Sequence, residues 1–122
     1  VRGNTSKEIV RMVREFGATK VFFVSACPPV KFPCFYGVDM PTRGELAAAQ
    51  RSVSEIEEYM GVDILMYQKI DDLVEAVTRK GEHNIDRPCM ACLNGRYVTG
   101  DIDEQTMENM EQQRNHERSQ QK

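Results

Sequence analysis

Two short apolar runs, set among segments of helical spacing, constrain the fold of this chain more than any other feature. The first run, 20–26, is continuous and rich in aromatic and β-branched residues, which is typical of a strand buried on both faces. The second run, 63–68, is shorter. Apolar residues at helical intervals predict helices over 6–16, 53–60 and from Asp71 to about Gly81. This alternation predicts an α/β fold with a largely parallel sheet.

Polar residues and glycines indicate where these helices begin and end. We expect Thr5 or Ser6 to cap the first helix, because their hydroxyls can accept a hydrogen bond from a backbone N–H of the first turn. Ser52 or Ser54 should cap the helix over 53–60 in the same way. Gly61 is expected to close that helix, since glycine readily takes a left-handed conformation.

Prolines mark the longest irregular segment. Residues 27–34 contain three prolines in eight positions, which predicts an extended loop because proline lacks an N–H and disfavours helix at the preceding residue. After this loop the sequence predicts a short strand within 35–41 and a helix over 45–50.

The last third of the chain has weaker signals. We expect irregular structure over 82–95 and an edge strand over 96–99. From Gln105 onward the apolar residues are Met107 and Met110 alone. Such a segment should be a frayed, solvated helix or disordered, without a face that can join a core.

Composition excludes several classes of protein. The chain has 122 residues, 40% apolar and 29% charged, which is typical of one globular domain or part of one. A net charge of −3 argues against bulk binding of nucleic-acid phosphates. No stretch approaches the ~18 apolar residues of a membrane span. The first residues lack both an initiator Met and the pattern of an export signal, so we expect a cytoplasmic protein and a segment of a longer chain.

Four cysteines are candidates for metal binding. Cys89 and Cys92 form a C-x-x-C turn, in which two thiolates can face one metal ion, and Cys34 could supply a third from a distant loop. In the cytoplasm such cysteines more often hold metal or do redox chemistry than form disulfides. Cys27 and His83 are further potential ligands. The alternative is that these are small buried residues and one solvated histidine.

A second candidate site lies at the start of the chain, where Arg2, Gly3, Asn4, Thr5 and Ser6 precede a helix. Free backbone N–H groups at a helix N-terminus, together with two hydroxyls, can hold a phosphate group. A glycine lets the backbone approach such an anion closely. From composition alone, an ordinary capped helix start explains the same residues.

Several longer motifs resemble one enzyme family. The start, VRGNTSKEIV, resembles the end of the phosphoribosyl pyrophosphate (PRPP) signature of type I phosphoribosyltransferases, which in amidophosphoribosyltransferases ends in VRGTTS. The segments FGATKVFFVSACPPVKFPCFYGVDMPTRGEL, IEEYMGVDILMYQ and CMACLNGRYVTGDID look like later parts of the same family, in the same order. The resemblance covers about residues 1–103 and points to the C-terminal portion of a glutamine PRPP amidotransferase.

The resemblance implies a fold and a division of the chain. Residues 1–103 would be the C-terminal half of a type I phosphoribosyltransferase domain, a parallel sheet flanked by helices, ending in an irregular cysteine-containing loop. Residues 104–122 would be a polar helical or disordered tail. The acidic pair that binds PRPP and its Mg²⁺ in this family would precede Val1, so this segment alone is expected to be inactive.

The family's activity is also implied for a full-length parent. Such an enzyme is a glycosyltransferase that makes 5-phosphoribosylamine from PRPP and glutamine, the first committed step of de novo purine biosynthesis. A glutaminase domain of the same chain supplies ammonia, purine nucleotides inhibit, and the enzyme is a homo-oligomer; no nucleic-acid or membrane partner is expected. The alternatives are a non-catalytic nucleotide- or metal-binding module and a truncated paralogue.

Residue by residue, the resemblance assigns two sites. Arg2, Gly3, Asn4, Thr5 and Ser6 match the loop that binds the 5-phosphate of PRPP or a nucleotide, with Asn4 where threonine is usual.

Some members of the family carry a [4Fe–4S] cluster on four cysteines. Cys34, Cys89 and Cys92 match three of these ligands, and the fourth would lie upstream. Cys27 stands where a small residue is usual and is not assigned as a ligand. The polar tail is more similar to the members without a cluster.

Overall fold

The computed structural model describes residues 1–78, 85 and 87–120. The elements in this part of the chain are α1 (Asn4–Glu15), β1 (Phe22–Ser25), the 3₁₀ turn η1 (Arg43–Glu45), α2 (Ala47–Gln50), α3 (Val53–Met60), β2 (Ile64–Tyr67), α4 (Ile70–Thr78), α5 (Ala91–Asn94) and α6 (Glu104–Gln120). No helix among the described residues is both long enough and apolar enough to cross a membrane.

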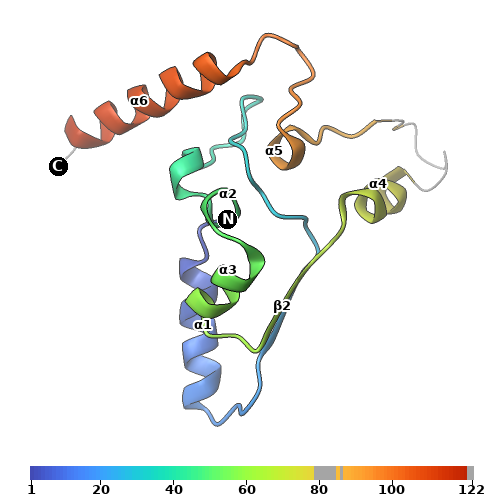
Figure 1. Cartoon of the computed structure of the whole chain (residues 1–122), viewed down its shortest axis with the longest axis vertical. Coiled ribbons are helices and arrows are strands. Elements are labelled where there is room, and N and C mark those ends of the chain that lie inside the picture. Colours follow the sequence, from blue (N-terminus) through green and yellow to red (C-terminus); the bar gives the residue numbers. More distant parts are fainter. Residues whose placement is uncertain (79–84, 86, 121–122) are drawn as a thin grey trace.

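The two strands form a parallel pair, which confirms the predicted α/β class (Figure 1). Phe22 lies opposite Ile64, and Ser25 lies opposite Tyr67. The loop before β2 is tied to the one before β1 by Asp63, whose carboxylate accepts from the Val21 N–H at 2.8 Å. The same carboxylate forms an ion pair of 2.8 Å with Arg14, which joins α1 to the sheet.

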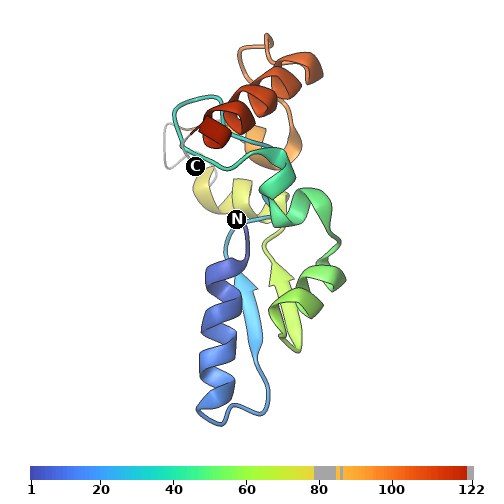
Figure 2. The ribbon, with the colours of Figure 1, turned by 90° about the vertical axis from the view of Figure 1, so that its left-hand side faces the viewer.

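Helices α1 and α3 lie on the same side of this sheet (Figures 1 and 2). Beneath α3 is the first buried cluster, to which helices and strand contribute Ala47, Ile56, Met60 and Leu65. The opposite face of the sheet exposes Phe22, Val24, Ile64 and Met66. The prediction that the first strand is buried on both faces is therefore wrong for the described part of the chain, because its helices cover one face and side chains alternate between faces.

The predicted helix 53–60 is confirmed at both ends. Ser52 is the N-cap, and its side chain and that of Glu55 form a reciprocal capping box. Gly61 closes the helix with a φ of 72°.

At α1 the predicted cap is wrong. The helix begins at Asn4, and the N-cap position belongs to Gly3 with a φ of 85° and no side-chain cap. Thr5 and Ser6 therefore lie inside the first turn, where their hydroxyls are available for contacts other than capping.

Other boundary predictions were only partly right. The helix expected over 45–50 is two short pieces, η1 and α2, and α4 begins at Ile70, one residue before the predicted start at Asp71. The predicted end of α4 near Gly81 lies outside the described residues. The strands expected within 35–41 and over 96–99 are wrong, because both segments have loop and turn conformations. The segment expected to be irregular over 82–95 contains the short helix α5.

The C-terminal segment forms a helix, which was one of the two predicted alternatives, but it contributes to a core, contrary to the sequence prediction. Met107 is buried together with Ala91 and Tyr97, and Phe32, Phe35 and Ile102 pack against them. An ion pair of 2.7 Å between Arg43 and Glu104 holds the start of the helix to the body of the molecule. A helix with an almost entirely polar pattern is thus held by one buried methionine, by the Arg43–Glu104 pair and by Arg114, which contacts Met40 and Asp39.

Candidate functional site

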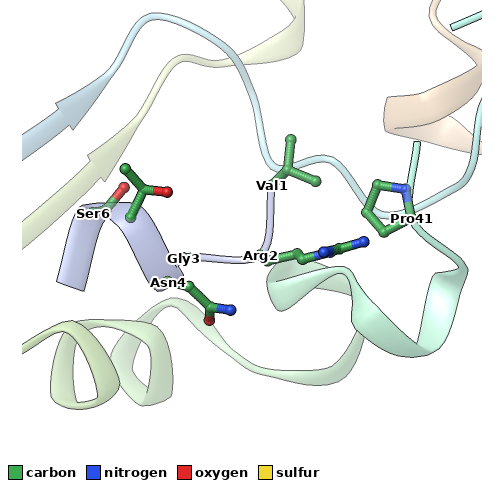
Figure 3. A pocket seen from close by; sticks show the side chains of 7 residues that line it. Val1, Arg2, Gly3, Asn4, Ser6 and Pro41 are labelled. Carbon is green, nitrogen blue, oxygen red and sulfur yellow. The ribbon is translucent and has the colours of Figure 1, made fainter. Parts of the chain in front are cut away.

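A cavity of about 370 Å³ opens at the N-terminus of α1. It is lined by Val1, Arg2, Gly3, Asn4, Thr5, Ser6 and Pro41. Figure 3 shows these side chains around the chain segment that leads into the helix. Both strands point their carboxyl ends toward this end of the molecule (Figure 2). In open parallel sheets, ligands usually bind outside the carboxyl ends of the strands.

The backbone of the cavity is arranged to accept an anion. The first intrahelical bond of α1 runs from the Lys7 N–H to the Gly3 carbonyl at 2.9 Å. The N–H groups of Asn4, Thr5 and Ser6 therefore precede the first bonded turn and have no acceptor within the helix. Their partial positive charge, added to the helix dipole, favours a negatively charged group at this position.

Glycine is required at position 3 by the backbone. Its φ of 85° lies in the left-handed region, which side chains with a Cβ rarely adopt. A Cβ there would meet the Tyr59 ring at an ordinary contact distance of 3.5 Å. The conformation, more than crowding, therefore excludes other residues, and it turns the backbone N–H groups that follow toward the cavity.

Tyr59 of α3 supports this loop from the side. Its hydroxyl donates to the Asn4 Oδ1 atom at 2.9 Å. The Lys7 ammonium lies 4.3 Å from the centre of the Tyr59 ring, and the Arg51 guanidinium lies 5.0 Å from it. The bond orients the Asn4 amide, so its NH₂ group is left to donate elsewhere. Asn4 thus has a partner that fits its amide oxygen.

The segment 42–47 holds the other side of the loop. The Arg2 Nη2 atom and the Glu45 Oε1 atom form an ion pair of 3.1 Å. The other carboxylate oxygen of Glu45 accepts from the Thr42 N–H at 3.2 Å and from the Thr42 hydroxyl at 3.1 Å. The Ala47 N–H donates to the Val1 carbonyl at 3.0 Å. The start of the chain is therefore tied to η1 and α2 by both side chain and backbone.

The cysteines lie in a separate region, around α5. The Cys92 carbonyl accepts from the N–H groups of Lys31 and Phe32 at 2.9 and 3.0 Å, which fixes the proline-rich loop against α5. The Cys34 sulfur accepts from the Tyr36 N–H at 3.4 Å. All four cysteines are free thiols; Cys27 and Cys89 are exposed, and Cys34 and Cys92 are half-buried.

The thiol groups of the four cysteines lie near one another. Burial raises the pKa of Cys92, and negative charge on Cys27, Cys34 and Cys89 would raise it further. Among the described residues, no three His, Cys, Asp or Glu side chains are placed so that they could hold a metal ion. The assignment of Cys34, Cys89 and Cys92 to a cluster stays a prediction, and His83 lies outside the described residues.

The structure thus brings together the five residues that the sequence singled out at the start of the chain, and it adds three that the sequence reasoning missed. Pro41, Glu45 and Tyr59 are distant in sequence from the loop and reach it only in the folded chain. The sequence gives one indication for Glu45, because Thr42-x-x-Glu45 has the spacing of a capping box. Nothing local in the sequence indicates that Tyr59 would reach Asn4.

Comparison with known proteins identifies the relatives of this segment. No protein-family model matches the chain. The amidophosphoribosyltransferase of Pseudomonas aeruginosa is 45% identical over 115 residues, or 94% of this chain. That of Escherichia coli is 43% identical over the same length, and that of Synechococcus elongatus is 50% identical over 97 residues.

Solved structures agree with the sequence comparison. The glutamine PRPP amidotransferase of Bacillus subtilis, in complex with ADP and GMP, superposes with a TM-score of 0.71 at 42% identity, over 80% of this chain. A structure described as the allosteric regulatory enzyme of purine biosynthesis gives 0.67 at 40% identity. The resemblance inferred from the motifs and the partial α/β phosphoribosyltransferase fold are therefore confirmed. The chain spans about a quarter of the length of these relatives, 23% in the Pseudomonas protein and 22% in the Bacillus structure.

Proposed function

We propose that this chain is part of the phosphoribosyltransferase domain of an amidophosphoribosyltransferase, and that its first turn binds the 5-phosphate of PRPP. The whole protein would form 5-phosphoribosylamine from PRPP and glutamine in purine biosynthesis. The observation that carries the proposal is the cavity at the N-terminus of α1, which Arg2, Gly3, Asn4, Thr5 and Ser6 line together.

The chemistry of the cavity suits a phosphate monoester. A phosphate there would accept from the N–H groups of Asn4, Thr5 and Ser6 and from the hydroxyls of Thr5 and Ser6. Charge-assisted hydrogen bonds of this kind are stronger than neutral ones, and several donors converge on a single anion. The same group occurs in purine nucleoside monophosphates such as GMP, so we propose that these compete for this loop.

The role of this segment in the reaction is to hold one end of the substrate. Fixing the 5-phosphate places the ribose so that its C1 atom can meet ammonia in a defined orientation, which lowers the entropic part of the barrier. The described residues that line the cavity include no Asp or Glu. The Mg²⁺ that we propose to accompany PRPP would neutralise the departing pyrophosphate, and its protein ligands would come from outside this segment.

The proposal is tested by binding of ribose 5-phosphate to the chain, followed through the backbone N–H resonances of Asn4, Thr5 and Ser6. In the unmodified chain these three resonances should shift together. Thr5→Val should weaken binding about ten- to hundredfold, because one lost charge-assisted hydrogen bond costs roughly 1.5–3 kcal/mol.

Thr78→Val is the matched control. The Thr78 hydroxyl donates to the Val74 carbonyl within α4 at 2.8 Å and takes no part in the cavity. This variant should bind ribose 5-phosphate as the unmodified chain does. Equal affinity in the Thr5→Val and unmodified chains would refute the assignment. Binding that shifts other resonances and leaves the α1 N-terminus unchanged would favour a different nucleotide-binding site.

A further inference from the structure

The contacts of Arg2 separate it from the other residues of the proposed phosphate loop. Its guanidinium extends from the loop toward Pro41, away from the first turn of α1 (Figure 3). There it forms its ion pair of 3.1 Å with Glu45. A positive charge that is already paired contributes less to binding an anion than an unpaired one would.

Glu45 is itself held in place. One of its oxygens accepts both donors of Thr42, and Thr42 is 95% buried, with an exposed fraction of only 5%. The next residues, Leu46 and Ala47, are buried as well. The carboxylate that Arg2 reaches therefore belongs to an anchored element, and its Oε1 atom faces the start of the chain, where it pairs with Arg2.

We propose that Arg2 and Glu45 are a positioning pair for the phosphate loop, and that Arg2 is not itself a ligand of the phosphate. The pair, with the bond from Ala47 to Val1, fixes the two residues before Gly3. Gly3 then keeps its left-handed conformation, and the loop populates fewer alternative conformations before the ligand binds. This inference rests on the proposed function, because it assumes that the loop binds a phosphate group.

The physical reason is preorganisation. An exposed ion pair adds little to the stability of a protein. A loop whose N–H groups already point at one place nevertheless loses less conformational freedom when the anion binds. The effect of the pair should therefore be visible in affinity and small in stability.

Substitutions can separate positioning from direct binding. In Glu45→Gln, the amide oxygen can still accept from Thr42, so the capping box is kept, while the NH₂ group cannot accept from Arg2. We expect Glu45→Gln and Arg2→Gln each to weaken ribose 5-phosphate binding about three- to tenfold. The double variant should bind no more weakly than either single variant, because the pair acts as one unit.

Glu15→Gln is the matched control, since Glu15 pairs with Arg11 near the opposite end of α1. It should leave the affinity unchanged. The thermal midpoint of Glu45→Gln should stay close to that of the unmodified chain, and the resonances of Asn4, Thr5 and Ser6 should broaden or shift before ligand is added. Arg2→Lys, which can still reach Glu45, should retain more affinity than Arg2→Gln.

The outcomes distinguish this inference from the proposed function. If the unmodified chain does not bind ribose 5-phosphate, the proposed function fails and the inference fails with it. If the unmodified chain binds and Glu45→Gln binds equally tightly, the pair does not position the loop. If Glu45→Gln binds more tightly, Arg2 is a ligand that Glu45 restrains. In both cases only the inference is wrong. Additive losses in the double variant would also overturn it. Should Glu45→Gln fail to fold, an Arg2→Lys chain that binds no better than Arg2→Gln would overturn the inference as well.

Discussion

The two buried clusters in the described part of this chain are built from different kinds of structure. The first is formed by regular elements, with Ile56 and Met60 on α3 facing Leu65 on β2. The second gathers around Tyr97, which lies in a loop between two helices. Its ring meets Phe35 edge to face at 5.0 Å, and its hydroxyl donates to the Pro33 carbonyl at 2.8 Å.

The difference shows two ways in which a small chain can hold a site in place. In the first region, apolar residues at helical and strand spacing pack helices on a sheet, and the cavity lined by the start of α1 lies at the end of that sheet. In the second region, aromatic rings and a buried hydroxyl fix a proline-rich loop to the short helix α5 and to α6. The first region should therefore depend mainly on apolar burial, and the second on a small number of specific contacts.

The largest effect is expected at Ile56, which is 1% exposed. Ile56→Ala should lower the free energy of unfolding by about 2–5 kcal/mol, because it removes buried methylene groups and leaves a cavity in the first cluster. Urea unfolding followed by circular dichroism measures this loss. Val53→Ala on the same helix is the control, since Val53 is exposed, and it should change stability by less than about 0.5 kcal/mol. Similar losses in both variants would mean that the first cluster is not a packed core.

A smaller loss is expected at Tyr97, where a single atom is removed. Tyr97→Phe keeps the ring packing but leaves the buried Pro33 carbonyl without its donor. Loss of this bond should cost about 1–3 kcal/mol in unfolding free energy, again measured in urea. Tyr36→Phe is a comparison variant, because the Tyr36 hydroxyl bonds to Thr99 at an exposed position and should matter less. If Tyr97→Phe left the stability unchanged, the second region would not depend on this specific contact, and the proposed difference between the two regions would be wrong.

The same residue predicts a dependence on alkaline pH. Burial raises the pKa of Tyr97 from its ordinary value of 10.0 to about 12. Because the folded state favours the neutral hydroxyl, its contribution to stability is complete below about pH 10 and is lost as the pH rises toward 12. Thermal midpoints between these pH values should fall less steeply in Tyr97→Phe than in the unmodified chain. Parallel curves for the two chains would contradict this assignment.

The smallest expected effect is a difference in rate among the thiols of the second region. Cys92 should react with a disulfide reagent at pH 8 about severalfold more slowly than the exposed Cys27 and Cys89, because burial raises its pKa and less thiolate is present. Mass spectrometry of partly modified chain gives the order of reaction. We expect the isolated chain to carry no iron–sulfur cluster, so that all four thiols react.

The cluster predicted for a full-length protein has a separate test. Serine at Cys34, Cys89 or Cys92 should remove iron and sulfide, whereas Cys27→Ser should retain them. Full iron content in the Cys89→Ser protein would exclude the three-cysteine assignment. In the isolated chain, joint protection of Cys34, Cys89 and Cys92 with a reactive Cys27 would show that these three bind a metal without the upstream ligand.

The sequence singled out the residues that line the cavity at the start of α1, because they form a short, contiguous segment. Gly3 and the hydroxyls of Thr5 and Ser6 are adjacent, and the helix that follows is readable from its spacing. The supporting contacts could not be predicted. Tyr59 and Glu45 reach the loop across more than 40 positions of sequence. The spacing of Thr42 and Glu45 indicates a local capping box, but not the contact of Glu45 with Arg2.

By itself, the sequence determined the elements whose signals are local: the helix 53–60 between its serine cap and Gly61, and the two strands. These depend on hydrogen bonds and backbone preferences within a few residues. Only the tertiary structure decided that Met107 would be buried in an almost wholly polar helix, that 96–99 would form a turn, and that one face of the sheet would stay exposed. Each of these outcomes depends on which distant side chains cover a surface, and burial is a property of the packed molecule that neighbouring residues in the chain do not specify.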